Sequence, residues 1–368
     1  MSAQIEIIII ACLVAVACAI PGVLLVLRKM SLMSDAISHS ILLGIIIAFL
    51  FVKNLGSPLL IIGAAIMGVI TVSLTELLRN TNKVKEDAAI GLVFPALFSI
   101  AIILITKFAS GVHIDTDAVL LGEIAFAPFD RLSVFGMDIG PQSMWIMAAI
   151  LIINVAFVLL FYKELKLSTF DAGLAATLGF MPALLHYGLM SIISITAVGA
   201  FDIVGSVLVV AFVIAPPAAA YLLTERLDWM LIISSILGMV SAISGYFFAL
   251  AFDVSIAGSM ASMTGVLFVL TLIFAPQKGL LSKAALYWQQ KWVFATHMLA
   301  VHLLDHEGRE EENIENRVST LHRHLNWEEG FSRKVIRKAV SQELVLHEGE
   351  MLRLTSLGRE TAKRVMSE

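Results

Sequence analysis

The sequence predicts an all-α polytopic membrane protein that ends in a small α+β domain. Three observations support this fold class. The chain has 368 residues, of which 59% are hydrophobic and only 15% are charged, and its mean hydropathy is +0.91. Apolar runs of about 20 residues, the length of a membrane-spanning helix, recur up to about residue 275. Beyond Lys278 these runs stop and charged residues become frequent.

We expect nine spanning helices, because lipid cannot satisfy the free backbone groups of irregular segments. Their approximate ranges are 5–27, 32–52, 57–78, 88–106, 142–162, 181–198, 203–223, 230–250 and 256–275. The change in composition places a domain boundary after residue 278. This boundary gives a transmembrane domain over 1–278 and a second domain over 279–368.

The short loops predict the orientation of the chain in the membrane. The cations on one side are Arg28, Lys29, Arg79, Lys83, Lys85, Lys163, Lys166, Arg226, Lys278 and Lys283. The opposite loops carry chiefly Lys53, Lys107 and Arg131. The positive-inside rule therefore puts the N-terminus outside and the C-terminal domain in the cytoplasm. No basic residues precede the first apolar run, so we interpret it as an uncleaved span rather than a signal peptide.

Asp35 and His39 are the main candidates for a functional site, since both lie within the second apolar run. Their spacing of four residues puts both side chains on one face of a helix. Ionisable residues inside a membrane span are costly and usually functional. A carboxylate with an imidazole suits Mn²⁺, Fe²⁺ or Zn²⁺. Two ligands do not complete a metal site, so a hydrogen-bonded polar pair at the mouth of a helix is the alternative.

Other polar residues in the apolar runs have simpler explanations. Asp202 is expected at the outer start of the seventh span, where it either contacts a cation, as a tentative metal ligand, or caps the helix. Asp253 has the same two explanations before the ninth span. His186 is expected to be a hydrogen-bonded packing residue, and Glu76 to pair with Arg79 three residues later.

Three further segments carry functional signals. Pro216 and Pro217 lack N–H groups and should break the seventh span, where they would act as a hinge or line a cavity. The segment 163–180 is expected to form one short helix against the membrane that docks a soluble partner or merely connects two spans. The segment 107–141 contains His113, Asp115, Asp117 and Glu123, which either guide a cation inwards or belong to a solvated loop.

Six segments carry a resemblance to a known family. They are LRKMSLMSDAISHSILLG (27–44), EDAAIGLVF (86–94), DTDAVLLGEI (115–124), FDAGLAATLG (170–179), DIVGSVLVVAFVIAPPAAAYLL (202–223) and DVSIAGSMA (253–261). Together they make residues 5–275 similar to the permease subunit of ABC-type manganese, zinc and iron importers. The chain departs from the family pattern at Ser34, where glycine is usual, and at Pro217, where alanine is usual.

The resemblance implies a permease that imports Mn²⁺, Zn²⁺ or Fe²⁺ as its substrate and holds no permanent cofactor. It implies three kinds of partner: cytoplasmic ABC ATPase subunits that use ATP, a second copy or sister permease, and an extracytoplasmic metal-binding lipoprotein. Asp35 and His39 match the metal pair of the family. The residues that match the ATPase-coupling helix are Phe170, Asp171, Ala172, Gly173, Ala175 and Gly179. The sequence has no GxxxxGK[ST] motif, so the partner is expected to hydrolyse the ATP.

The C-terminal segment has the pattern of a winged helix-turn-helix. We expect helices over 284–307, 309–324 and 329–342, then a hairpin around Gly349 and a last helix. Although Arg333, Lys334, Arg337 and Lys338 cluster on one helix, nucleic-acid binding is disfavoured. From Lys283 onwards, 13 Lys and Arg balance 13 Asp and Glu, whereas a DNA-binding module should be basic. Contact with the ATPase or the partner permease is the favoured use.

Two other functions remain open from the sequence. One is a membrane-tethered transcription regulator that senses metal, for which the pairs His302/His306 and His322/His324 are candidate ligands, although histidines without a ligand role explain these pairs as well. The other is an ATP-independent channel or carrier, against which the docking segment 163–180 argues.

Overall fold

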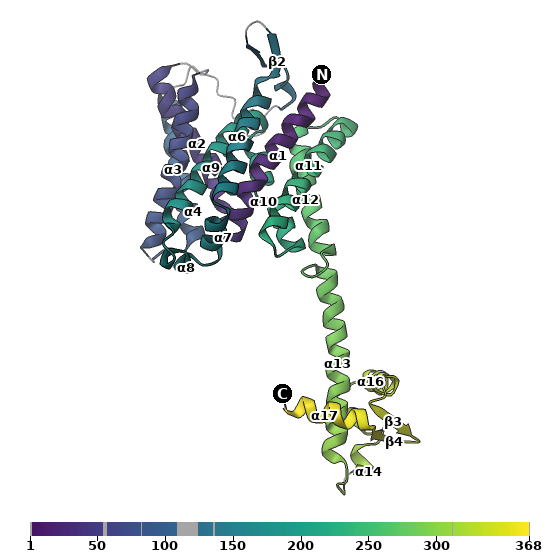
Figure 1. The fold of residues 1–368 in the computed structure, drawn as a ribbon. Coiled ribbons are helices and arrows are strands. Elements are labelled where there is room, and N and C mark those ends of the chain that lie inside the picture. Colours follow the sequence, from purple (N-terminus) through teal and green to yellow (C-terminus); the bar gives the residue numbers. More distant parts are fainter. Residues whose placement is uncertain are drawn as a thin grey trace. The chain divides into compact units, whose positions relative to one another are not determined.

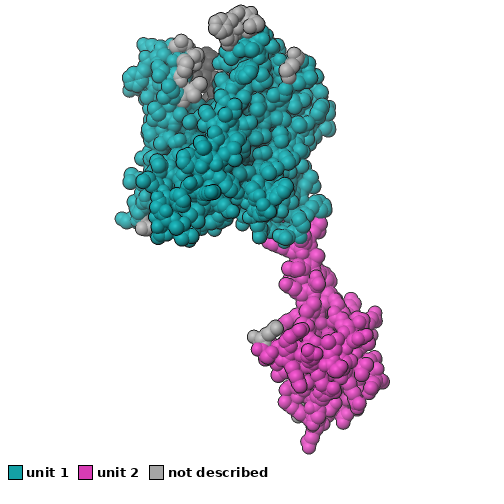
Figure 2. Space-filling model, viewed as in Figure 1, with its two compact units in different colours: residues 1–279 teal, residues 280–368 magenta. Residues whose placement is uncertain are grey.

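A computed structural model of the chain describes residues 2–53, 57–81, 83–108, 124–134, 137–310 and 312–367. The chain divides into two compact units, Met1–Gly279 and Leu280–Glu368 (Figure 2). The boundary expected from the sequence falls one residue earlier. We call these parts unit 1 and unit 2 and describe each by itself.

The described residues of unit 1 contain nine helices that are long and apolar enough to cross a membrane, which confirms the predicted fold class. They are α1 (Ala3–Leu27), α2 (Leu32–Val52), α3 (Pro58–Asn80), α4 (Glu86–Phe108), α6 (Gln142–Leu160), α9 (Pro182–Val204), α10 (Ser206–Leu223), α11 (Leu227–Phe252) and α12 (Ile256–Phe274) (Figure 1).

Helix α1 is the centre of unit 1. It packs against α6, α9, α10 and α11, and its side chains from Ile10 to Leu25 are mostly buried. A helix that is apolar on all sides is suited to such an interior position. A second group forms around α2, which packs against α3, α4, α9 and α10.

A buried polar contact compensates for a proline in α1. Pro21 has no N–H, so the carbonyl oxygen of Ala17 loses the partner it would have in a regular helix. The Nδ2 atom of Asn154 in α6 donates to that oxygen at 2.8 Å and to Oγ1 of Thr196 in α9 at 2.9 Å. Asn154 and Thr196 are both 1% exposed. One amide therefore connects three helices at the point where the first is weakened.

The expected break at Pro216 and Pro217 is wrong, because α10 continues through both residues. The backbone hydrogen bonds of α10 still lack two N–H donors, because proline has none. Pro217 leaves free the carbonyl four residues earlier, which belongs to Val213. This carbonyl faces Gly22 of α1, where a Cβ atom would overlap with the oxygen. The missing side chain lets α1 pack directly against the proline turn, and this close packing supports the continuous helix.

The start of α10 also differs from the prediction. Gly205 has a φ of +80° and separates α9 from α10, so α9 extends to Val204 and α10 begins only at Ser206. Asp202 consequently lies in the last turn of α9. It therefore does not cap the following helix, which was one of the two roles that the sequence predicted for it.

A β-hairpin lies between α4 and α6 and was missed in the sequence. After a 3₁₀ turn over Ile124–Phe126, strand β1 (Arg131–Val134) pairs in antiparallel fashion with β2 (Met137–Pro141). The hairpin and the N-terminus lie at the same end of unit 1 (Figure 1), where Arg131 approaches Oε2 of the buried Glu6 to 3.5 Å. The candidate residues His113, Asp115, Asp117 and Glu123 lie outside the described residues.

Unit 2 has the expected long first helix, the helix before the hairpin, the hairpin and the last helix, but the expected second helix is different. Its elements are α13 (Leu280–His306), α14 (Glu312–Glu315), α15 (Leu321–His324), α16 (Glu329–Ser341), β3 (Val345–Glu348), β4 (Met351–Leu354) and α17 (Ser356–Ser367). The predicted hairpin is confirmed, with Glu348 opposite Met351.

The predicted helix over 309–324 is wrong, because two short helices replace it. Between them, Arg317 pairs with Met351 of β4. The N–H of Val318 donates to the Glu350 carbonyl, and the N–H of Leu352 donates to the Asn316 carbonyl, both at 3.0 Å. These residues add a short third segment to the hairpin. Because their backbone is extended, the predicted helix cannot continue through them.

We predict that Asn154→Leu lowers the free energy of unfolding by about 1 kcal/mol, because the Ala17 carbonyl is left without a donor. The measurement is denaturation in mixed micelles. Pro21→Ala supplies a backbone N–H to the same oxygen, so Asn154→Leu should cost clearly less in the Pro21→Ala background. If Asn154→Leu lowers the free energy of unfolding equally in both backgrounds, then Asn154 does not compensate for the N–H that Pro21 lacks.

Candidate functional site

Helix α2 places Asp35 and His39 on one face, as the sequence predicts. Nε2 of His39 lies 3.3 Å from Oδ1 of Asp35, and the two side chains are 29% and 38% exposed. The imidazole stacks on Phe94 with ring centroids 5.8 Å apart and meets the edge of Phe98 at 5.9 Å. Both aromatic rings belong to α4, so packing against α4 fixes the orientation of the histidine. The pair can offer one nitrogen and one carboxylate to a cation.

The pair is not a complete metal site. Among the described residues, no group of three or more His, Cys, Asp or Glu side chains is arranged to hold a metal ion. Metal sites with strong retention use at least three protein ligands. Two partly exposed donors on a helix face are therefore suited to a weak site, or to one that another molecule completes.

The structure does not bring Asp202 to this pair. Arg28, seven residues before Asp35, contacts His186 in the second turn of α9. Asp202 follows His186 by 16 residues on the same helix, which corresponds to about 24 Å along its axis. Asp202 is exposed and lies at the opposite end of α9.

The predicted docking segment consists of two helices, α7 (Tyr162–Phe170) and α8 (Ala172–Thr177), where one was expected. Asp171 separates them because its backbone is extended, and its carboxylate accepts the N–H of Leu174 at 2.9 Å. A residue that caps a new helix cannot continue the previous one. Gly179, with a φ of +87°, follows the end of α8.

The α7–α8 segment exposes large apolar side chains outside the spanning helices. Phe170, Leu174 and Leu178 are 62%, 47% and 60% exposed, while Ala175 is buried beneath them. Apolar side chains gathered on one short segment are typical of a protein interface. The predicted residues Ala172, Gly173 and Gly179 are exposed in the same segment.

Arg28, at the end of α1, connects this segment to the spanning helices. Its Nε donates to Oγ1 of Thr169 at 3.1 Å, and its Nη2 donates to Oγ of Ser168 at 3.0 Å. Nη1 lies 3.3 Å from Nδ1 of His186 in α9. Ser168 and Thr169 are in the last turn of α7, two or three residues before Asp171. The guanidinium fork therefore fixes the end of α7 to α1 and α9.

The contacts continue from His186 to α3. Nε2 of His186 lies 2.8 Å from Oε1 of Glu76, and Glu76 pairs with Arg79 at 3.5 Å, as predicted for the latter pair. We call Arg28, Glu76, Arg79 and His186, with Ser168 and Thr169, the polar junction. A cavity of about 560 Å³ lies beside it. The sequence predicts only a packing role for His186 and gives no signal of the junction, because its members are far apart in the chain.

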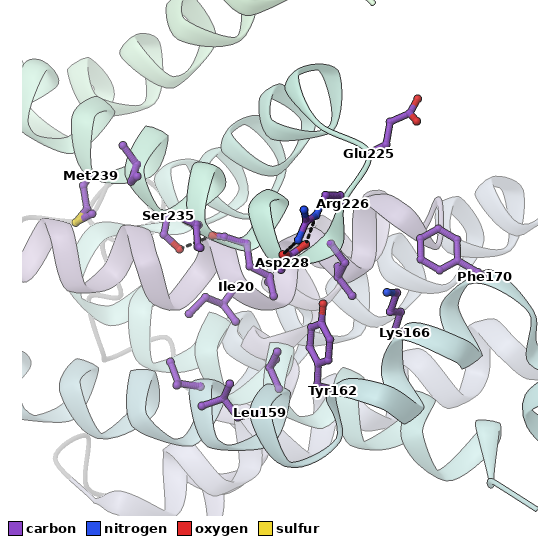
Figure 3. Close-up of a pocket in the computed structure, with 16 residues that line it drawn as sticks. Ile20, Leu159, Tyr162, Lys166, Phe170, Glu225, Arg226, Asp228, Ser235 and Met239 are labelled. Atoms are coloured by element: carbon purple, nitrogen blue, oxygen red, sulfur yellow. Dashed lines mark hydrogen bonds and ion pairs between the residues drawn. The ribbon is translucent and has the colours of Figure 1, made fainter.

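A larger cavity of about 930 Å³ lies between α1, α6, α7 and α11 (Figure 3). Its walls are mostly apolar, and Lys166, Arg226 and Asp228 lie at one end beside Phe170. Asp35 and His39 do not line it. The cavity is therefore separate from the predicted metal pair.

Unit 2 brings two histidines to one carboxylate and places a third histidine beside them. Nδ1 of His324 lies 2.8 Å from Oε2 of Glu315, and Nε2 of His302 lies 3.9 Å from the same oxygen. The rings of His302 and His306 are 4.5 Å apart. Burial, which disfavours the charged imidazole, lowers the pKa of His302. Of the four histidines that the sequence predicts as candidate ligands, His302, His306 and His324 lie together here.

Comparison with known proteins connects these features to one family. The model of the ABC 3 transport family matches residues 3–275. The zinc transport system membrane protein TroD of Treponema pallidum is 46% identical over 353 residues, which is 96% of each chain. The manganese transport system membrane protein MntD of Bacillus subtilis is 48% identical over 271 residues, or 74% of this chain and 92% of MntD. The TroD match is longer than unit 1 and extends into unit 2.

Solved structures agree with the sequence relatives. PsaBC from Streptococcus pneumoniae, solved in complex with a Fab, resembles this chain with a TM-score of 0.63 at 27% identity. The match covers 76% of this chain and 94% of that chain. An inward-facing conformation of a putative metal-chelate type ABC transporter has a TM-score of 0.52 at 16% identity and shows the fold alone.

We predict that acid destabilises unit 2 through His302. Its pKa is lower in the folded chain than the ordinary value of about 6.5, so the unfolded chain binds the proton more readily. The contribution of His302 is favourable above about pH 6.5 and is lost as the pH falls through and below that value. The measurement is the temperature at which a protease cleaves within 280–368 of the full-length protein, at pH 7 and pH 5. His302→Leu should reduce the pH difference, whereas His347→Leu, at an exposed position of β3, should not.

Proposed function

Because the chain belongs to the ABC 3 transport family, we propose that it is the membrane-spanning permease subunit of an ATP-driven importer of Mn²⁺, Zn²⁺ or Fe²⁺. The observation that carries the metal pathway is the Asp35–His39 pair on a partly exposed face of a spanning helix. The metal is the transported substrate, and the protein needs to hold it only transiently.

We infer that a second permease, either another copy or a sister subunit, completes the metal site. Each subunit contributes one carboxylate and one imidazole, so two facing subunits supply four donors, the number that a tetrahedral ion uses. Support comes from the exposure of both side chains and from the lack of a third ligand among the described residues. A site divided between two subunits opens when they separate, and this provides a route for release.

The α7–α8 segment is the proposed docking site for a cytoplasmic ABC ATPase, which binds and hydrolyses ATP. Its exposed apolar side chains fit a protein partner, and the sequence has no phosphate-binding motif of its own. The cations Lys163, Lys166, Arg28 and Arg79 on the same side support a cytoplasmic location for this face, with the N-terminus outside. A metal-binding lipoprotein would deliver the ion on the opposite side of the bacterial inner membrane.

The polar junction is the proposed mechanical link between docking and transport. A movement of α8 acts on the end of α7, whose two hydroxyls are bound to Arg28. Arg28 directly precedes the link to α2, which carries Asp35 and His39. Pro216 and Pro217 lie next to α1 at Gly22 and form the proposed hinge of α10.

The alternative of a membrane-tethered transcription regulator has no support among the relatives reported above, because their names describe transport systems. Unit 2 keeps its balanced charge, so we propose that its winged-helix-like arrangement binds protein rather than nucleic acid.

We predict that Asp35→Ala and His39→Ala each reduce metal uptake by about 10-fold or more. Even partners that only support metal ligands contribute 10- to 100-fold to affinity, so loss of a ligand costs at least as much. The measurement is uptake of radioactive Mn²⁺ or Zn²⁺ by cells with the complete transporter, at equal amounts of permease in the membrane. Asp202→Asn is the control and should retain uptake. Loss with Asp202→Asn but not with Asp35→Ala would move the pathway to the opposite end of α9.

We predict that Arg28→Gln uncouples ATP hydrolysis from transport, because glutamine cannot bind two hydroxyls and His186 at once. Reconstituted transporter with Arg28→Gln should hydrolyse ATP within about 2-fold of the wild-type rate, as docking is intact, and should import several-fold less metal for each ATP. Lys29→Gln, at the exposed neighbouring position, is the matched control and should leave this ratio unchanged. An equal loss of both activities would indicate a general folding defect instead.

A further inference from the structure

The cavity of about 930 Å³ is a groove between two spanning helices. Helices α6 and α11 both pack against α1 but have little contact with each other, so the space between them stays open above α1. Ile20 of α1 lines the groove and is 8% exposed, while Leu159 of α6 and Ile232 of α11 are 70% and 49% exposed. The groove is therefore apolar and runs along the spanning helices.

The two ends of the groove differ in chemistry. Figure 3 shows Tyr162, Lys166, Arg226 and Asp228 at one end, whereas Leu159, Ile20 and Met239 lie towards the other. The polar residues come from α7, which follows the end of the α6 span, and from the turn that precedes α11 and its first residues. A polar rim at the end of a membrane span and an apolar channel within the span match the two parts of a lipid molecule.

Among the charged residues that the structure describes at the polar end of the groove, one cation has no ionic partner. Asp228 accepts two hydrogen bonds from Arg226, at 3.2 Å and 2.7 Å, and Glu225 pairs with Lys278 at 3.5 Å. Both carboxylates thus have basic partners. In the part of the chain that the structure describes, Lys166 has no ion-pair or hydrogen-bond partner. The charges of the four charged residues that line this end sum to zero, but Lys278, from outside the groove, also neutralises Glu225. Among the described residues of this end, Lys166 is thereby left as the one cation available to an anionic group.

Tyr162 adds a hydrogen-bond donor to the same end. Burial, together with the nearby Asp228 carboxylate, raises the pKa of its phenol above the ordinary value. The phenol therefore stays protonated at neutral pH and can donate to a phosphate oxygen.

We propose that this groove binds a phospholipid, whose phosphate lies against Lys166 and Arg226 and whose acyl chain lies between α6 and α11. The volume of about 930 Å³ is in the range of small-molecule sites. A water-soluble ligand would leave the exposed apolar walls of the groove unmatched, whereas a phospholipid supplies an acyl chain for these walls and a phosphate for Lys166. The proposal goes beyond metal transport and does not depend on Asp35 or His39.

The position of the site gives the lipid a route to the docking segment. Lys166 and Phe170 both line the groove and belong to α7, and the last turn of α7 is bound by Arg28. A phosphate held by Lys166 adds a further restraint on the helix that precedes α8.

Photolabelling of the full-length permease tests the proposal. The protein is placed in vesicles of phosphatidylethanolamine and phosphatidylglycerol with a trace of phospholipid that carries a diazirine on its acyl chain. After irradiation, mass spectrometry locates the labelled residues. We expect enrichment on Leu159, Ile232 and Ile236 relative to other lipid-facing positions, since a retained chain spends longer beside them.

Two pairs of variants identify the headgroup and chain contacts. Lys166→Glu should lower the groove labelling about fivefold, the effect of losing the attraction of one lysine to a phosphate headgroup. Lys163→Glu, at an exposed position of α7 outside the groove, should not. Ile232→Trp should displace the label by filling the groove, whereas Ile243→Trp, on the exposed surface of α11, should leave it in place.

Other outcomes would overturn the proposal. Even labelling of all lipid-facing helices would mean that the groove holds no bound lipid. Groove labelling that is unchanged by Lys166→Glu would remove the phosphate contact. Labelling that is lost when a second permease is present, with crosslinks between α11 and that subunit, would make the groove a subunit interface. None of these results depends on metal uptake, so a failure here leaves the proposed transport function intact.

Discussion

The absence of hydrogen-bonding solvent inside a membrane is the constraint on which unit 1 depends. Each proline in a spanning helix frees a carbonyl that water cannot satisfy there. For Pro21 the chain supplies the Asn154 amide as a donor. At Pro217 the freed carbonyl of Val213 faces Gly22, where the missing side chain allows close packing of the two helices. Both sites involve α1. The helix that is most uniformly apolar therefore also organises the polar irregularities of its neighbours.

One end of the spanning bundle carries two kinds of polar group with different uses. Near the polar junction, Arg28, Glu76 and His186 are occupied by one another and by two hydroxyls, which favours a fixed geometry. Asp35 and His39, only a few residues away in the chain, keep partly exposed donors. A rigid connection beside an adaptable binding pair is a suitable arrangement for a permease, because force must pass through one while an ion passes the other.

The sequence predicts the nine spans and the pair on α2 because both rest on local periodicity. It fails wherever distant residues decide. The helix expected over 309–324 is replaced by an extended pairing of Arg317 with Met351, and the helix expected over 163–180 is divided by the Asp171 cap. The polar junction joins residues up to 158 positions apart, so no window of sequence contains it. The hairpin at Arg131 gave no strong strand signal, because β2 contains Asp138, Gly140 and Pro141, residue types that are uncommon in strands.

The central position of α1 has a consequence for biosynthesis. This helix is synthesised before the helices it packs against, and its partner α11 begins only at Leu227, about 200 residues after α1 ends. At typical elongation rates of about 5–20 residues per second, α1 waits at least about ten seconds for that neighbour. Its apolar surface on every side can rest in lipid during this interval, while the freed Ala17 carbonyl waits for Asn154 of α6. The same property that suits α1 to a buried core therefore also protects the nascent chain while that core is incomplete.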